Sequence, residues 1–190
     1  MGFGTVQGPA PLVMPPITAE SLPYIYPKQA YPTSSDALVA LRHASELSSK
    51  GLYDESIAVL DVAIDTGEPN PYLHYNRAHS NAMQANYEVA VDDYSRCLEL
   101  EPLNPTAWCS YAYSLARCNR QLEAIAAYTQ AINQHPSEAS NYFLRAASLL
   151  MAGDMAGVLS DIDEGKRLNG VVMRRLIAEV LEDADTDAMK

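Results

Sequence analysis

Apolar, small and polar residues recur in the same order every 34 residues from Ala37 onward. Counted from Ala37, Pro71, Pro105 and Ala139, the eighth position of every block is alanine, and the twentieth, twenty-fourth and twenty-seventh positions follow a small, large, small pattern. Small residues at fixed places let two helices approach closely, so the period predicts four helix pairs. The positions that carry it are Ala44, Ala78, Ala112 and Ala146; Ser56, Ala90, Ala124 and Val158; Leu60, Tyr94, Tyr128 and Ile162; and Ala63, Cys97, Ala131 and Gly165.

The same period predicts where each helix lies. Pro102 and Pro136 close the second and third blocks, where a helix has to stop. Beyond Asn169 and Gly170, apolar residues continue at helical spacing, which predicts one more helix covering the last apolar face. First helices are expected near residues 37–50, 71–84, 105–118 and 139–152, and second helices near 54–67, 88–101, 122–135 and 156–168.

The N-terminal segment, residues 1–36, has a different composition. Seven of the twelve prolines lie within its first 35 residues, and its only charges before Ser35 are Glu20 and Lys28. Because proline interrupts helices and few apolar side chains are present to offset chain entropy, we expect an extended arm that orders only against another surface. Its tyrosines, Tyr24, Tyr26 and Tyr31, are candidate partner contacts. The arm is expected either to occupy a groove of its own chain or to lie on a neighbouring protein.

The second block matches a known repeat family closely. It reads Tyr75-Asn76-Arg77-Ala78, then Asn86-Tyr87-Glu88-Val89-Ala90, Asp93-Tyr94 and Leu98-Glu99-Leu100-Glu101-Pro102. This pattern resembles the tetratricopeptide repeat (TPR), with repeats over residues 37–70, 71–104, 105–138 and 139–172. The resemblance implies an all-α fold, namely a right-handed superhelical α-solenoid of helix hairpins with a capping helix in residues 173–190 and an extended proline-rich N-terminal arm.

In this family the first helices line a concave groove that binds a peptide or a partner helix. Carried onto this sequence, the resemblance predicts a groove that is aromatic and weakly polar. Rigid aromatic side chains there would receive an apolar or proline-containing segment at low entropic cost. The alternative is that individual aromatic residues pack between repeats instead. The candidate groove residues are Arg42, Tyr72, Tyr75, Asn76, His79, Cys109, Tyr113 and Phe143.

A subclass of the family consists of co-chaperones that grip a C-terminal carboxylate with lysine, asparagine and arginine side chains. In this chain, the matching positions are Leu41, Ser45, Asn76, Thr106 and Ser110, and only Asn76 fits. No cation in these positions would neutralise an acidic terminus. A co-chaperone that binds a chaperone or client peptide is therefore the alternative function and not the preferred one.

Charge excludes two classes of partner. Thirteen Lys and Arg against twenty-four Asp and Glu give a net charge of -11, which repels phosphate backbones and anionic lipid surfaces. We therefore expect neither a nucleic-acid partner nor a membrane partner. No stretch approaches 18 consecutive apolar residues, and the first residues lack the pattern of a signal peptide. The expected location is cytoplasmic.

Few residues suggest catalysis or metal binding. Cys97, Cys109 and Cys118 lack metal-ligand spacing and are odd in number, which is typical of free thiols in a reducing compartment. The four histidines show no HExxH spacing, and no glycine-rich phosphate loop is present. We expect no enzymatic activity, no metal and no cofactor.

One basic group departs from the acidic background: Lys166, Arg167, Arg174 and Arg175. Cations near the end of a helix interact favourably with its dipole, and the alternative is docking on an acidic protein surface. Taken together, the sequence predicts a non-enzymatic scaffold or adaptor that binds other proteins within a larger intracellular assembly. By analogy with small TPR proteins that carry extended arms, a cytoskeletal, ciliary or axonemal assembly is the preferred interpretation.

Overall fold

A computed structural model describes residues 35–67 and 69–188, with side chains placed up to Ala178. The arm tyrosines Tyr24, Tyr26 and Tyr31 lie outside the described residues. The regular structure in the described ranges is entirely helical, as the repeat pattern predicts.

Eight helices follow one another along the described chain, and each begins and ends within two residues of its expected range up to the start of the last one. The long last helix includes the segment expected to form the additional helix. Their bounds are α2 (Ser35–Ser49), α3 (Tyr53–Thr66), α4 (Pro71–Met83), α5 (Tyr87–Leu100), α6 (Pro105–Arg117), α7 (Gln121–Gln134), α8 (Ala139–Ala152) and α9 (Met155–Ala188).

Local chemistry explains where the first helices of the central repeats begin. The Asn70 side chain accepts a hydrogen bond from the Tyr72 backbone N–H at 2.9 Å, and the Asn104 side chain accepts one from the Ala107 N–H at 2.9 Å. Proline follows each asparagine at a position where its missing N–H costs nothing. The pair Asn-Pro thus starts both α4 and α6.

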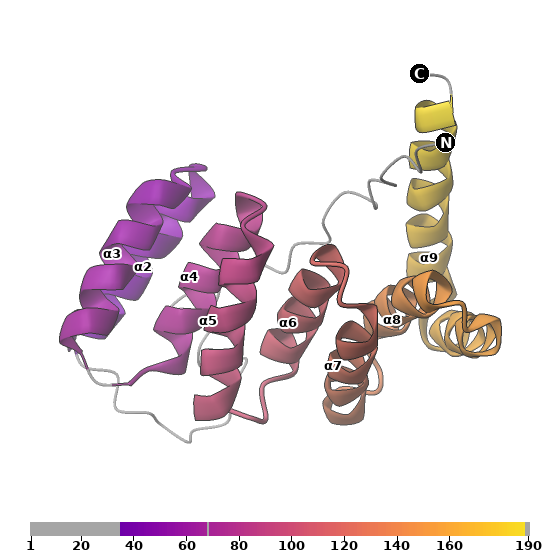
Figure 1. Ribbon diagram of the computed structural model, residues 1–190, viewed down its shortest axis with the longest axis horizontal. Helices are drawn as coiled ribbons and strands as arrows, with labels where there is room; N and C mark the ends of the chain where they lie inside the picture. The colour runs from indigo at the N-terminus through magenta and orange to yellow at the C-terminus, as the bar shows by residue number, and fades with distance from the viewer. Residues whose placement is uncertain (1–34, 68, 189–190) are drawn as a thin grey trace.

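Consecutive helices pack as antiparallel pairs (Figure 1). The alanines at the eighth repeat position and the small residues at the twentieth are buried, so the two helix backbones of each pair approach closely there. Larger side chains at the twenty-fourth position, including Tyr94 and Tyr128, are almost fully buried and fill the space beside these close approaches. The sequence pattern of small and large residues therefore corresponds to the core.

The row of pairs curves with the first helices on its inner side. Cα atoms of α2 and α4, of α4 and α6, and of α6 and α8 come within 8 Å of each other. Within the described ranges, no second helix approaches another second helix as closely. In Figure 1 the turns within the first three pairs lie at one edge of the row, and the links between pairs lie at the opposite edge. We call the side formed by α2, α4, α6 and α8 the inner face, and the edge with the turns the turn edge.

The last helix changes direction at Asn169, whose backbone is extended with φ -153° and ψ 86°. The Asn169 side chain accepts a hydrogen bond from the Val172 N–H at 3.1 Å, which caps a new helical segment. Figure 1 shows this segment leaving at a steep angle to the first half of α9. Met173 and Leu176 of the new segment are buried, so it covers the apolar end of the fourth pair.

Gly165 lies in close contact with this covering segment. A Cβ atom at Gly165 would lie 2.6 Å from the sulfur of Met173 and 2.8 Å from its terminal methyl carbon, so a larger residue would require the Met173 side chain to move. At Gly170, by contrast, an added Cβ meets only the tip of Arg174 at 3.7 Å.

We expect Gly165→Val to lower the free energy of unfolding by ~1–3 kcal/mol, because overpacking displaces Met173. Gly170→Val is the matched control and should change stability little. Urea denaturation followed by circular dichroism measures both. Equal stabilities for the two variants would show that the segment after Asn169 does not depend on contact with Gly165.

Candidate functional site

Tyr75 and Cys109, both predicted as groove residues, belong to the buried core. Tyr75 is fully buried, its ring meets that of Tyr94 edge-on with centroids 5.4 Å apart, and its hydroxyl lies 3.4 Å from the Ser110 hydroxyl. Cys109 is only 3% exposed and packs in the neighbouring cluster of buried residues. The assignment of Tyr75 and Cys109 to partner binding is therefore corrected: both stabilise the contact between repeats and offer no surface to a partner.

Three further predicted residues on α4 are each less than a tenth exposed: Tyr72, Asn76 and His79. Asn76 donates a hydrogen bond from Nδ2 to the Tyr72 carbonyl at 2.8 Å, one turn earlier on the same helix. Burial lowers the pKa of His79 to about 4, so this imidazole is neutral at physiological pH. These side chains contribute little exposed area on the inner face.

The remaining predicted residues are accessible. Arg42 on α2 is exposed, and Tyr113 on α6 and Phe143 on α8 are half-buried. All three belong to first helices, which form the inner face. Arg42, Tyr113 and Phe143 are therefore the predicted groove residues that can meet a partner in this conformation.

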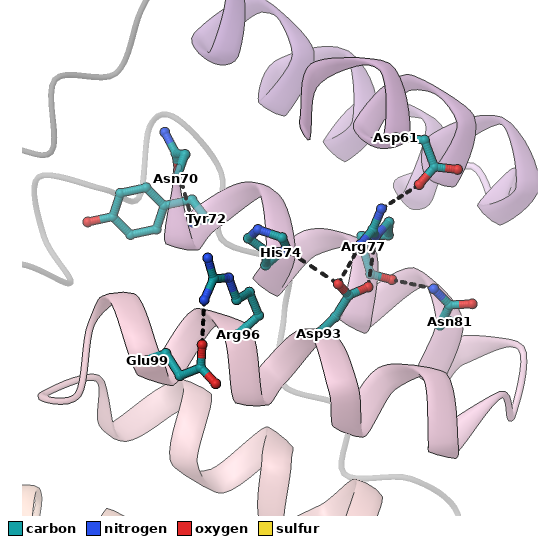
Figure 2. Close-up of polar contacts among 9 residues, drawn as sticks. All are labelled: Asp61, Asn70, Tyr72, His74, Arg77, Asn81, Asp93, Arg96 and Glu99. Atoms are coloured by element: carbon teal, nitrogen blue, oxygen red, sulfur yellow. Dashed lines mark hydrogen bonds and ion pairs between the residues drawn. The ribbon is translucent and has the colours of Figure 1, made fainter. Parts of the chain in front are cut away.

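The strongest polar arrangement in the described chain was not among the predicted sites. It centres on Arg77 of α4, which joins the second helices of two successive pairs (Figure 2). Its Nε and Nη2 donate to Asp93 of α5 at 2.8 and 2.7 Å, and its Nη1 donates to Asp61 of α3 at 2.7 Å. The Nδ1 atom of His74 lies 3.2 Å from the same Asp93 carboxylate. One arginine thus connects three helices.

The same arrangement recurs two repeats later. Arg145 of α8 donates to both oxygens of Asp161 at 2.8 and 2.6 Å, and its Nη1 donates to the Thr129 hydroxyl of α7 at 3.0 Å. Arg145, Asp161 and Thr129 stand 68 residues after Arg77, Asp93 and Asp61, which is twice the period. This recurrence is the sequence signal that identifies the bridge, and it indicates a structural role.

The surroundings of Asp93 set its acidity. Burial by itself would raise its pKa, but hydrogen bonds from His74 and Arg77, together with their charges, outweigh burial and hold the pKa below the usual range. The pKa of Arg77 is raised, chiefly by its hydrogen bond to Asp93. The pair is therefore ionised across the physiological range.

A second cluster lies at the turn edge and was also missed by sequence reasoning, apart from Tyr113. Arg117, the last residue of α6, has its guanidinium carbon 4.8 Å from the ring centroid of Tyr87 and 5.9 Å from that of Tyr113. Its Nη1 donates to the Tyr113 hydroxyl at 3.0 Å. The two rings meet edge-on with centroids 6.2 Å apart. The spacing of Tyr113 and Arg117, four residues apart on one helix face, is the signal that suggests this pair.

The basic residues near the end of the chain are exposed. Arg167 forms an ion pair with Glu164 one turn earlier on α9, with a closest distance of 2.5 Å, so its charge is matched within its own helix. Lys166 lies beside it, and Arg174 and Arg175 lie beyond the break at Asn169. Docking of this group on an acidic surface stays a prediction.

Other chemistry is sparse in the part of the chain that the structure describes. All three cysteines are free, and burial raises the pKa of Cys109 to about 12 and that of Cys118 to about 11. No three His, Cys, Asp or Glu side chains gather there as metal ligands would. Among the same residues we find no helix with the length and apolar character needed to cross a bilayer.

Comparison with solved structures identifies the fold. The TPR protein YrrB, described as having an unusual peptide-binding site, matches with a TM-score of 0.69 at 18% identity, over 78% of this chain and 76% of YrrB. A structure of MamA designated MSR-1 C2 matches with a TM-score of 0.65 at 18% identity, over 80% of this chain and 84% of MamA. The MamA RS-1 ArsTM double mutant gives 0.68 at 13% identity, over 83% of this chain and 99% of its own.

No family model matches the sequence, and no curated protein matches it. The likeness to these solved structures, together with the consecutive helix pairs, shows that the chain has the TPR fold.

We expect Arg77→Met to lower the free energy of unfolding by ~2–4 kcal/mol, because it leaves the buried Asp93 carboxylate without its main partner. Arg96→Met is the control, since Arg96 forms an exposed ion pair with Glu99 on one helix and its loss should cost less than ~1 kcal/mol. Chemical denaturation of the three proteins provides the comparison. Similar losses for both variants would contradict a special role for the bridge.

The depressed pKa of Asp93 also predicts a pH dependence. A carboxyl group whose pKa is lower in the folded state stabilises the protein above its unfolded pKa of ~3.9, and this stabilisation is lost as the pH falls through the lower folded value. The difference in unfolding free energy between the native chain and Asp93→Asn should therefore shrink below about pH 4. Urea titrations between neutral and acidic pH measure it, and a constant difference would be inconsistent with this assignment.

Proposed function

We propose that this chain, which has the fold of TPR proteins, is an interaction module that binds an extended peptide segment of a partner protein on its inner face. The observation that carries the proposal is the convergence of the first helices: α2, α4, α6 and α8 approach one another, whereas the second helices do not. Successive first helices therefore form one continuous surface on the inside of the curve. Such a surface suits a ligand that is long enough to contact several first helices at once.

The exposed residues of the inner face fit this kind of ligand. Tyr113 and Phe143, on neighbouring first helices, are half-buried aromatic side chains whose position is already restricted by packing. Restricted aromatic rings provide contact area with little further loss of entropy on binding. Arg42 adds a charged group on the first of the four helices. YrrB, which shares the fold, is described as having a peptide-binding site.

The finer parts of the functional prediction belong to the same proposal. The module would serve as a scaffold or adaptor in a larger intracellular assembly, with the N-terminal arm as a second contact. A cytoskeletal or ciliary assembly and a cytoplasmic location follow from analogy of architecture. The bound partner would be a protein, which the net charge of -11 favours over nucleic acid or an anionic membrane.

A selection from a displayed library of 12-residue peptides, carried out with the full chain, tests the proposal. We expect selected peptides to lose about tenfold in affinity when Phe143 is changed to Ala, because a buried aromatic contact is removed. Leu122→Ala is the control, since Leu122 is an exposed apolar residue on the second helix α7. Isothermal titration calorimetry compares the three proteins. Peptides whose affinity depends on Leu122 and not on Phe143 would refute binding at the inner face.

A further inference from the structure

The cluster formed by Tyr87, Tyr113 and Arg117 contains an arginine that the fold does not use as an ion pair. Five other arginines of the described chain pair with carboxylates, namely Arg77, Arg96, Arg120, Arg145 and Arg167. Arg117 pairs with none in the described residues, although the chain carries twenty-four acidic side chains. It contacts two tyrosines instead. Its charge is therefore held in place without being neutralised.

The hydrogen bond of Arg117 to Tyr113 uses only one side of the guanidinium. The Nη1 atom donates to the Tyr113 hydroxyl at 3.0 Å, and the described chain provides no hydrogen-bond acceptor for Nε or Nη2. Nε and Nη2 together form the planar fork that matches the two oxygens of a carboxylate. Arg117 as a whole is an exposed residue. Contact with two rings restricts the side chain in advance, which lowers the entropy lost on binding.

Neither of the neighbouring acids pairs with Arg117. Glu88, next to Tyr87, lies 3.8 Å from Arg120, and Arg120 also holds Glu123 through two hydrogen bonds of 2.7 and 2.8 Å. Both neighbouring carboxylates therefore pair with Arg120 and not with Arg117, although one arginine balances only one of their two charges. Arg117 follows Tyr113 by one helical turn, so the cluster joins the inner face to the turn edge.

We propose that the Tyr87–Tyr113–Arg117 cluster binds a single carboxylate of the partner peptide, so that the ligand is not purely apolar but carries one acidic group at this point. This inference rests on the proposed function of the inner face. A single monovalent cation matches the single negative charge of a carboxylate, whereas a phosphate dianion would leave a net charge uncompensated. The site differs from the co-chaperone positions considered from sequence, none of which holds a cation.

The carboxylate has two chemical sources, an Asp or Glu side chain or the C-terminus of the peptide. Peptides obtained by the library selection are therefore synthesised in three forms: unchanged, with a C-terminal amide, and with Asp or Glu replaced by Asn or Gln. Fluorescence anisotropy measures their affinity for the full chain at low and high salt. We expect one of the two replacements to weaken binding about tenfold or more, and the one that does so identifies the source.

Arg117→Gln tests the residue itself. It should weaken binding of the unchanged peptide by the same factor, about tenfold or more, and should cause no further loss for the neutralised peptide. Arg117→Lys keeps the charge but lacks the planar Nε–Nη2 fork. Its affinity for the unchanged peptide should therefore lie between that of the native chain and that of Arg117→Gln. Arg96→Gln is the matched control, because Arg96 is an exposed arginine of the second helix α5 and lies outside the proposed binding face. Thermal unfolding of each variant separates lost binding from lost stability.

The outcomes distinguish the two proposals. Peptides that bind through Phe143 but are insensitive to both the acid replacements and Arg117→Gln would overturn the carboxylate site and leave the proposed function standing. Equal losses for Arg117→Gln and Arg96→Gln would indicate diffuse charge attraction and also overturn the site. If no selected peptide depends on the inner face, the proposed function fails, and the carboxylate site fails with it.

Discussion

The close approach of two helices within each pair is the constraint on which the rest of the structure depends. It requires a small residue at the eighth position of each repeat and a compact one at the twentieth position, and the buried alanines Ala44, Ala78, Ala112 and Ala146 meet the first requirement in all four repeats. Because the pairs are narrow there, larger side chains such as Tyr94 and Tyr128 fill the neighbouring space. Each helix pair then stacks on the helix pair of the next repeat.

Polar bridges add a fixed relation between neighbouring pairs. Arg77 reaches the second helix of its own pair through Asp93 and that of the preceding pair through Asp61, and Arg145 repeats this geometry with Asp161 and Thr129. An apolar contact is non-directional, whereas an arginine that hydrogen-bonds to partners on two helices requires a defined geometry. These bridges therefore restrict how one pair can rotate on another, which keeps the inner face continuous.

Some of the candidate binding residues pack inside the repeats, and only the others are accessible to a partner. Tyr75 and Cys109 occupy positions of the inner helices that resemble binding positions, but the fold uses them to fill the contact between repeats. Tyr113, Phe143 and Arg117 stay accessible. Arg117 is the clearest case, since its contacts restrict its side chain while the described chain provides no hydrogen-bond acceptor for its Nε and Nη2 atoms.

The 34-residue period by itself determined the helix pairs, their bounds to within two residues and the identity of the small and large core positions, because close packing acts on residue size at fixed spacing. Which of the candidate residues face a partner was decided only by the tertiary structure. Exposure depends on neighbours from other repeats, as with Tyr75, whose ring packs on Tyr94. The Tyr87–Tyr113–Arg117 cluster likewise joins two repeats, so its members stand up to 30 residues apart in the sequence and meet only when the second and third pairs stack.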